Sequence, residues 1–174
     1  VANYRLTPEA GLPSRLYVNA AASPGGDGTS WALAMDDLQN AICQAVRSGG
    51  AVQEIWVRSG TYYPDLNSDL EQMAFYLRDN LAIYGGFAGT ETMLAQRNPA
   101  TNVTILSGEI GSAMTTLDNS NNVVMSIGNG ATARLDGFTI TKGSADTSNL
   151  YFTDDGGGML CDGSSPTVAN CTFS

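Results

Sequence analysis

The sequence predicts an all-β fold, a parallel solenoid of stacked coils with one N-terminal capping α-helix. From residue 52 onward, short apolar segments alternate with turns rich in Gly and Asn. Two of these segments align at an offset of 33 residues, as stacked repeats do. A single segment, residues 36–47, has apolar residues at helical spacing, which leaves no second helix for βαβ crossovers.

The repeat joins residues 135–140 to residues 168–173. In both copies apolar residues alternate with small polar ones, as in a strand with one buried face. The matched pairs are Leu135 with Val168, Phe138 with Cys171, Thr139 with Thr172, and Ile140 with Phe173. We therefore expect these two segments to stack on each other.

The predicted helix begins with Asp36 as N-cap, and Gln39 makes a pair with it that resembles a capping box. Arg47 lies in the last turn, where a cation suits the helix dipole. One apolar face is made of Leu38, Ala41, Ile42, Ala45 and Val46. We expect this face to cover the first coil, as terminal caps of repeat proteins do.

The rest of the chain divides into a lead segment or linker, residues 1–15, and a single domain, residues 16–174. Gly60 to Pro64 is predicted to be a turn, Gly85-Gly86 to end a strand, and residues 88–101 to form an excursion. The predicted strands are residues 16–18, 54–57, 75–77, 81–84, 103–106, 122–127 and 133–135.

Composition excludes several classes of function. The chain has 174 residues, a net charge of -9 and one lysine, so autonomous nucleic-acid binding is excluded. It has no histidine, which rules out Ser-His-Asp catalysis and histidine-ligated metals. No apolar run is long enough to span a membrane, and no signal peptide opens the chain. Carboxylate chemistry, oxygen-ligated calcium and non-catalytic functions remain.

Several motifs in serial order resemble a known family. They are Gly28-Thr29-Ser30-Trp31, Leu38-Gln39-Asn40-Ala41, Ile55-Trp56-Val57, Gly60-Thr61-Tyr62, Ile83 to Glu91, Ile105-Leu106-Ser107-Gly108, Leu135 to Ile140, Gly156 to Met159, Ser165-Pro166-Thr167 and Asn170 to Phe173. From about residue 16 onward the chain resembles the N-terminal part of bacterial exported right-handed parallel β-helix proteins, related to chlamydial polymorphic outer-membrane protein repeats. The resemblance implies roughly four to five coils, a place outside the cell or on its surface, and continuation into a longer protein.

Acidic residues supply the candidate catalytic and metal sites. Asp154 and Asp155 are a candidate pair for acid–base hydrolysis of sugars, and an acidic turn is the alternative. A calcium-assisted lyase site would gather Asp136, Asp146 and Asp162 with these two, and Arg134 or Lys142 would serve as base; solvated turn residues are the alternative. Asp27 is a candidate calcium ligand in a Gly-rich loop. Asp36-Asp37 resembles a catalytic pair, but helix capping explains both.

Tyr63 is the candidate for stacking on a sugar, because it lies beside Pro64. The other aromatic residues of the strands, Trp56, Tyr62, Tyr76 and Tyr84, are expected in core stacks. Cys161 and Cys171 allow either a disulfide or two small buried hydrophobic side chains. Asn102 and Asn170 lie in glycosylation sequons, which are expected to carry no meaning in a bacterial protein.

The expected function is a non-enzymatic extracellular or cell-surface structural or adhesion module. It would assemble through its open end with other copies of itself or with the remainder of a longer chain. The alternatives are a carbohydrate-binding module, and a polysaccharide lyase or glycoside hydrolase. Polysaccharide is the other partner considered. No cofactor is expected, and calcium binding is kept as an alternative. Leu38, Ile42, Phe138 and Cys171 are expected to be structural.

Overall fold

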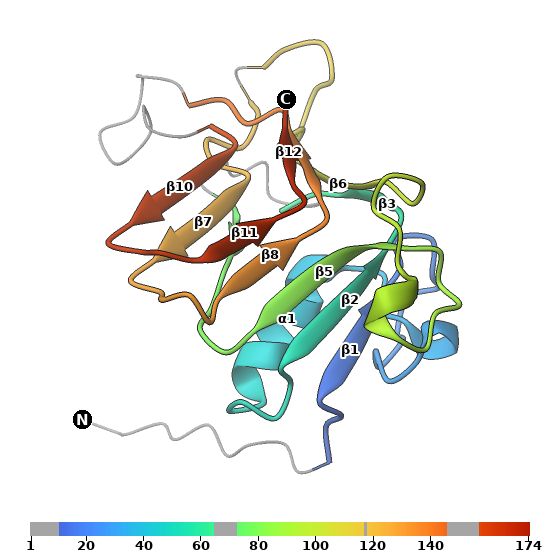
Figure 1. Cartoon of the computed structure of the whole chain (residues 1–174). Helices are drawn as coiled ribbons and strands as arrows, with labels where there is room; N and C mark the ends of the chain where they lie inside the picture. The colour runs from blue at the N-terminus through green and yellow to red at the C-terminus, as the bar shows by residue number, and fades with distance from the viewer. Residues whose placement is uncertain (1–10, 65–72, 117, 146–156) are drawn as a thin grey trace, which may run out of the picture.

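The computed structural model describes residues 11–64, 73–116, 118–145 and 157–174, which form parallel sheets and one α-helix (Figure 1). The helix is α1 (Leu38–Arg47), and two short 3-10 turns are η1 (Trp31–Leu33) and η2 (Leu94–Gln96). The strands are β1 (Arg15–Val18), β2 (Glu54–Arg58), β3 (Gly60–Tyr62), β4 (Phe75–Tyr76), β5 (Ala82–Phe87), β6 (Thr104–Ser107), β7 (Val124–Ile127), β8 (Arg134–Asp136), β9 (Thr139–Thr141), β10 (Met159–Asp162), β11 (Thr167–Ala169) and β12 (Thr172–Phe173).

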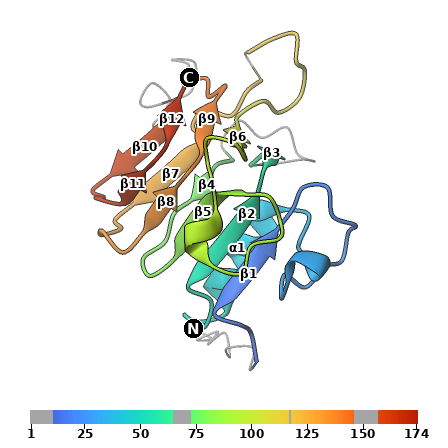
Figure 2. The same ribbon diagram turned by 45° about the vertical axis from the view of Figure 1, so that its right-hand side comes forward.

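The strands pair in three sheets, and every strand pairing is parallel. The first sheet has the order β1-β2-β5-β8-β11, the second β10-β7-β4, and the third β12-β9-β6-β3. Neighbouring strands come from distant parts of the chain. Figures 1 and 2 show β1 at one end of the molecule and β10, β11 and β12 at the other.

The predicted fold class is wrong. The described residues are α/β-like, with three parallel sheets and one helix. The sheets are flat rather than wound into a closed right-handed β-helix solenoid, and strands make up 31% of the described residues. The physical reason is that alternation and repeat offset specify which residues lie opposite one another. They do not specify how the sheets are oriented or closed, because loops set that geometry.

The predicted pairing of the two repeat copies is confirmed. Leu135 lies opposite Val168 in β8 and β11, and Thr139 lies opposite Thr172 in β9 and β12. The pairing continues from Ile140 to Phe173. The pattern of apolar and small polar residues therefore determined the register, as it must where one face of a strand is buried.

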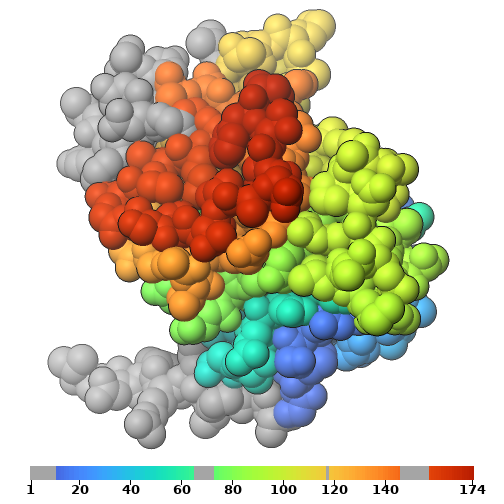
Figure 3. Space-filling model, viewed as in Figure 1, coloured from blue at the N-terminus to red at the C-terminus, as the bar shows by residue number. Residues whose placement is uncertain are grey.

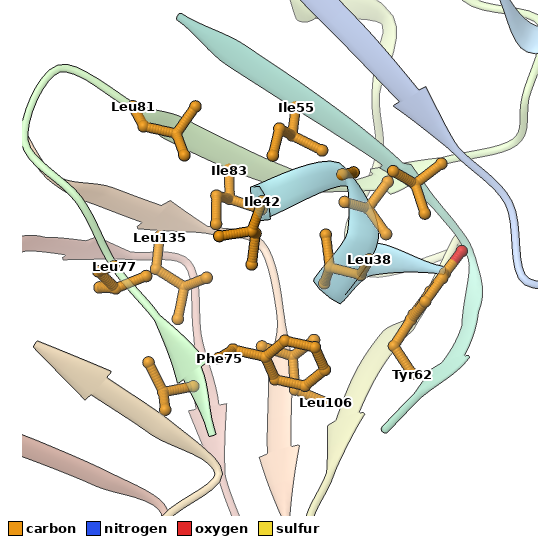
Figure 4. Packing of buried hydrophobic residues seen from close by; sticks show 14 of the residues in the cluster. Leu38, Ile42, Ile55, Tyr62, Phe75, Leu77, Leu81, Ile83, Leu106 and Leu135 are labelled. Carbon is orange, nitrogen blue, oxygen red and sulfur yellow. The ribbon is translucent and has the colours of Figure 1, made fainter. Parts of the chain in front are cut away.

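Inward-facing residues of paired strands form apolar columns. In the first sheet, Leu16, Ile55, Ile83 and Leu135 lie in register and are almost completely buried. In the third, Tyr62, Leu106 and Ile140 do the same, and in the second, Phe75 pairs with Val124. Figure 4 shows residues of these columns packed together with Leu38 and Ile42 of α1. The columns and the helix thus share one hydrophobic core.

Helix α1 covers one end of this core, as predicted, and it contacts β1 and β2. Its first residue and its cap differ from the prediction. Asp37, not Asp36, is the N-cap, and its Oδ1 accepts a hydrogen bond from the Asn40 amide at 2.8 Å. Val46 is 48% exposed rather than part of the buried face, because that face needs only Leu38, Ala41, Ile42 and Ala45 to meet the strands.

Four local predictions also differ from the structure. Gly60–Tyr62 forms β3 rather than a turn, because it pairs with β6. Strand β5 runs through Gly85 and Gly86 to Phe87. The repeat motif at 135–140 spans two strands, since Gly137 has a φ of 88° and turns the chain from β8 into β9. Arg15, assigned to the lead segment, begins β1.

Within the described ranges, no helix has the length and apolar character needed to cross a membrane. Residues 1–10 of the predicted lead segment lie outside the described residues.

Candidate functional site

Asp136, predicted as a ligand-binding carboxylate, is buried among cations. Its Oδ1 accepts hydrogen bonds from Arg97 Nη2 at 2.6 Å and from Asn170 Nδ2 at 2.8 Å. Its Oδ2 accepts from Arg134 Nη2 at 2.6 Å and from Arg134 Nε at 3.1 Å. Because both oxygens are engaged, the carboxylate joins the loop after β5 to β8 and to the turn after β11, and it leaves neither oxygen free for a substrate.

Burial and neighbouring hydrogen-bond donors shift the pKa of Asp136 in opposite directions. Burial alone would raise its pKa, but hydrogen bonds from Asn170, Arg97 and Arg134 outweigh that and lower the pKa below its ordinary value. Tyr84 lies beside the same cluster, with the Arg97 and Arg134 guanidinium carbons 5.2 and 5.9 Å from its ring centre. No pattern in the sequence points to Arg97, which lies 39 residues from Asp136 along the chain.

A groove of about 660 Å³ adjoins this cluster, between the segment around η2 and the turn from β8 to β9. Its walls include Arg97, Asn98, Phe138, Asn170 and Thr172. Glycine is favoured here because Gly137 has a φ of 88°, which residues with a side chain rarely adopt, and a Cβ there would also lie 2.5 Å from Arg97 Nη1. Phe138 itself is buried, as predicted for a structural residue.

Asp27, the predicted calcium ligand, makes a local turn. Its Oδ1 accepts hydrogen bonds from the Thr29 amide at 2.9 Å and the Thr29 hydroxyl at 2.7 Å. Those bonds lower its pKa. The described residues contain no group of three or more His, Cys, Asp or Glu side chains placed to hold a metal ion. Asp27 therefore acts as an Asx-turn residue.

Tyr63, the predicted sugar-stacking residue, lines a small pocket of about 170 Å³. Asp36, Asp37 and Thr61 line it too. Asp36 is half-buried, and its carboxylate makes no hydrogen bond or ion pair with any residue that the structure describes. An aromatic ring beside carboxylates is an arrangement that suits sugar hydroxyls and ring carbons.

The other aromatic residues divide between core and surface. Tyr62 is buried as predicted; its hydroxyl donates to the Arg58 carbonyl at 2.9 Å and accepts from the Ala20 amide at 3.2 Å. Burial raises its pKa to about 12. Trp56 is buried on the other side of the first sheet, stacked on Phe87 with ring centres 4.5 Å apart. Tyr76 and Tyr84 are half-buried rather than core residues.

Cys161 and Cys171 are free thiols. Cys161 is exposed, whereas Cys171 packs against the hydrophobic core, where burial raises its pKa. The sequon residues Asn102 and Asn170 use their amide groups internally, on the Gly86 carbonyl and the Asp136 carboxylate. The candidate carboxylates Asp146, Asp154 and Asp155 lie outside the described residues.

The remaining candidate, Asp162, lies on an exposed strand edge made by β10, β11 and β12, which we call the distal edge. Each of these strands pairs on one side only within the described residues. The apolar columns end there, at Val168 and Phe173, which are 39% and 50% exposed. Figure 3 shows this part of the chain (red) at the molecular surface.

Asp162 is the single charged residue in the three strands of the distal edge. Among the residues that the structure describes, the edge therefore combines apolar side chains, strand backbone without a second pairing partner, and little charge. Such an edge is a template for pairing with another strand.

The chain matches no known family model, no curated protein and no solved structure. The distal edge is accordingly the candidate functional site on physical grounds alone.

Proposed function

We propose that the chain is a non-enzymatic structural or adhesion module that acts outside the cell or on its surface and assembles through the distal edge. One observation carries this proposal. The column Leu16, Ile55, Ile83 and Leu135 is buried to 1% exposure or less, yet its next member, Val168, is 39% exposed. A further strand placed on β11 would bury Val168 and extend the ladder.

The proposed occupant is a second copy of the chain. Because the edge strands carry one charge, Asp162, two copies meet there without opposing clusters of like charge, despite the net charge of -9. Closed two-fold dimers of this kind bring the same patch of each subunit together.

The opposite edge of the first sheet is already covered, which favours a dimer over a filament. Beyond β1, the Asn19 amide donates to the Met35 carbonyl at 2.8 Å and the Met35 amide donates to the Tyr17 carbonyl at 2.9 Å. In a head-to-tail contact, the distal edge of a second copy would have to pair with the outer side of β1. The segment at Met35 already occupies that position. Within the described residues this sheet therefore has no second open edge, which favours two copies over continued growth.

Light scattering after size exclusion, over a hundredfold concentration range, tests the proposal. We expect a mass of 18.2 kDa at low concentration that doubles as concentration rises. Val168→Lys should keep the chain monomeric, because it adds charge to the edge. Val46→Lys is the matched control, since Val46 is also exposed but lies on α1. A constant mass of 18.2 kDa, or equal effects of the two variants, would contradict assembly through this edge.

A carbohydrate-binding module is the second candidate, and the pocket at Tyr63 is the observation that favours it. The experiment is retention of the chain on insoluble polysaccharides with Tyr63→Ala and, as control, Tyr76→Ala. Loss of retention in the first variant alone supports sugar binding. Unchanged retention of Tyr63→Ala would contradict sugar binding at this pocket. Hydrolysis or lyase chemistry gains no support from Asp136, because its carboxylate is fully paired.

A further inference from the structure

The groove beside Arg97 lies between the segment around η2 and β12 (Figure 3, yellow-green and red), and it differs in charge from the rest of the molecule. The chain carries 17 acidic and 8 basic residues, yet none of the described residues that line this groove is acidic, and Arg97 is the one charged residue among them. Arg97 and Arg134 share a single carboxylate, that of Asp136, so this cluster keeps a net charge of +1. The groove is therefore a place where an anionic ligand is attracted to a chain whose net charge of -9 otherwise repels it.

Arg97 keeps donors that its ion pair does not use. Its guanidinium donates to the Gly85 carbonyl at 3.0 Å, to the Asp136 carbonyl at 3.1 Å and to Asp136 Oδ1 at 2.6 Å. Because a guanidinium has five N–H donors, Nε and one hydrogen of Nη2 have no partner within the described ranges. Nε is not among the described buried atoms that lack a partner, so it reaches solvent. A charged donor in this position suits a carboxylate.

Four uncharged polar side chains of the groove also have unpaired groups. Thr139 and Thr172 lie opposite each other in β9 and β12, and neither hydroxyl makes a hydrogen bond with a described residue. Asn98 Oδ1 accepts two backbone amides of its own turn at 3.1 and 3.3 Å, which leaves Nδ2 as a donor. Asn170 uses Nδ2 on the neighbouring carboxylate, which leaves Oδ1 as an acceptor. Donors, acceptors and hydroxyls side by side are what a ligand rich in hydroxyl groups requires.

We propose that this groove binds a glycan strand that carries carboxylate groups. Arg97 pairs with a carboxylate, while the two asparagines and the two threonines bind sugar hydroxyls. Leu94 and Pro99, which also line the groove, contact the carbon atoms of the sugar ring. The groove, about 660 Å³, has the size of a small-ligand site, and such sites combine apolar walls with a few polar groups that fix orientation. The proposal does not rest on assembly through the distal edge, and its site is separate from the pocket at Tyr63.

Calorimetric titration of the full chain, at a concentration where light scattering gives the monomer mass, tests the proposal. The probes are oligosaccharides of β-linked glucuronic acid and the matching cello-oligosaccharides, which carry a hydroxymethyl group in place of each carboxylate. We expect the acidic probe to bind more tightly by about tenfold or more, and its binding to weaken as salt is added.

Asn98→Asp should abolish binding, because it replaces the unpaired donor with a charged acceptor while Oδ1 can still accept the two turn amides. Thr172→Val should weaken binding by about threefold, because it removes one hydroxyl. Asn80→Asp is the control, since it adds the same charge at an exposed residue outside the groove. It should change binding by less than about twofold.

Absence of binding by the unaltered chain would overturn the proposal, and so would equal affinity for the acidic and the neutral probe. Equal losses in Asn98→Asp and Asn80→Asp would attribute the effect to overall charge rather than to the groove, which overturns it too. Loss of binding in Tyr63→Ala, with Asn98→Asp unaffected, would place the glycan in the other pocket instead.

A polyglutamate peptide bound as tightly as the acidic glycan would show that the groove recognises carboxylates without sugar hydroxyls, and that result would also overturn the proposal. If Asn98→Asp fails to fold, the exposed Thr172→Val still decides. Assembly is measured by mass and glycan binding by heat, so the two proposals fail independently.

Discussion

Arg97 Nη2 lies 2.6 Å from Asp136 Oδ1, and this pair links the loop around η2 to strand β8. The Arg97 side chain is 12% exposed and that of Asp136 is 2% exposed. Nη1 of the same guanidinium donates to the carbonyls of Gly85 and Asp136 at 3.0 and 3.1 Å. One arginine thus holds two neighbouring strands and the loop that covers them.

Asp136→Asn should destabilise the fold by about 3 kcal/mol, because it leaves two arginines close together without their shared anion. Urea denaturation at pH 7 measures this change. Glu54→Gln is the control, since it removes an ion pair with Arg15 in which both side chains are 31% exposed, and it should cost about 1 kcal/mol or less. Equal costs would show that the Asp136 cluster is no stronger than a surface pair.

The same carboxylate should make stability depend on acid pH. The pKa of Asp136 is lowered in the folded chain from an ordinary value of 3.8, so the folded state binds fewer protons than the unfolded state around that pH. Its contribution is therefore complete above that value and is lost as pH falls through the lowered pKa. Urea midpoints measured from pH 6 to pH 2 should fall less steeply for Asp136→Asn than for the unaltered chain. Parallel curves would contradict this.

Tyr62→Phe should cost about 1–2 kcal/mol, because the Ala20 amide and the Arg58 carbonyl each lose a hydrogen-bond partner. The pKa of about 12 has a second consequence: the unfolded chain releases this proton near pH 10, so stability falls between those two values. The ultraviolet titration of the unaltered chain minus that of Tyr62→Phe isolates this tyrosine, and at pH 11 the difference should be small in the folded chain and large in urea. Tyr63→Phe is the control, and its hydroxyl makes no hydrogen bond in the described parts of the chain.

Asp37→Ala should destabilise the fold by about 1 kcal/mol, whereas Asp36→Ala should change stability by about 0.5 kcal/mol or less. Asp37 accepts the Asn40 amide at the start of α1, and Asp36 makes no such bond. Thermal unfolding of both variants measures the difference. A larger loss of stability in Asp36→Ala than in Asp37→Ala would instead support Asp36 as the N-cap, as the sequence pattern predicted.

Strand pairing could be predicted from the sequence where side chains contact neighbours of the same kind. The arrangement of the sheets and the contacts made by loops could not. Leu135 and Val168 could be paired in advance because the alternation around them is the same in both copies. The choice between Asp36 and Asp37 depends on where the backbone turns helical, which adjacent identical residues cannot indicate. The partners of Asp136 and the closure of the sheets depend on long loops, whose conformation no local pattern specifies.

Val124→Ala and Val168→Ala test whether the contribution of a side chain to the free energy of unfolding depends on its position within a column. Val124 is fully buried in β7 between Phe75 and Met159, whereas Val168 is 39% exposed at the distal edge. In monomeric protein, Val124→Ala should cost about 2 kcal/mol and Val168→Ala about 1 kcal/mol or less, since the second removes fewer buried methyl contacts. At concentrations where the chain dimerises, the cost of Val168→Ala should rise toward that of Val124→Ala, because a partner strand would then bury the side chain. Urea denaturation at two protein concentrations separates these outcomes. A concentration-independent cost at Val168 would mean that assembly, where it occurs, uses another surface.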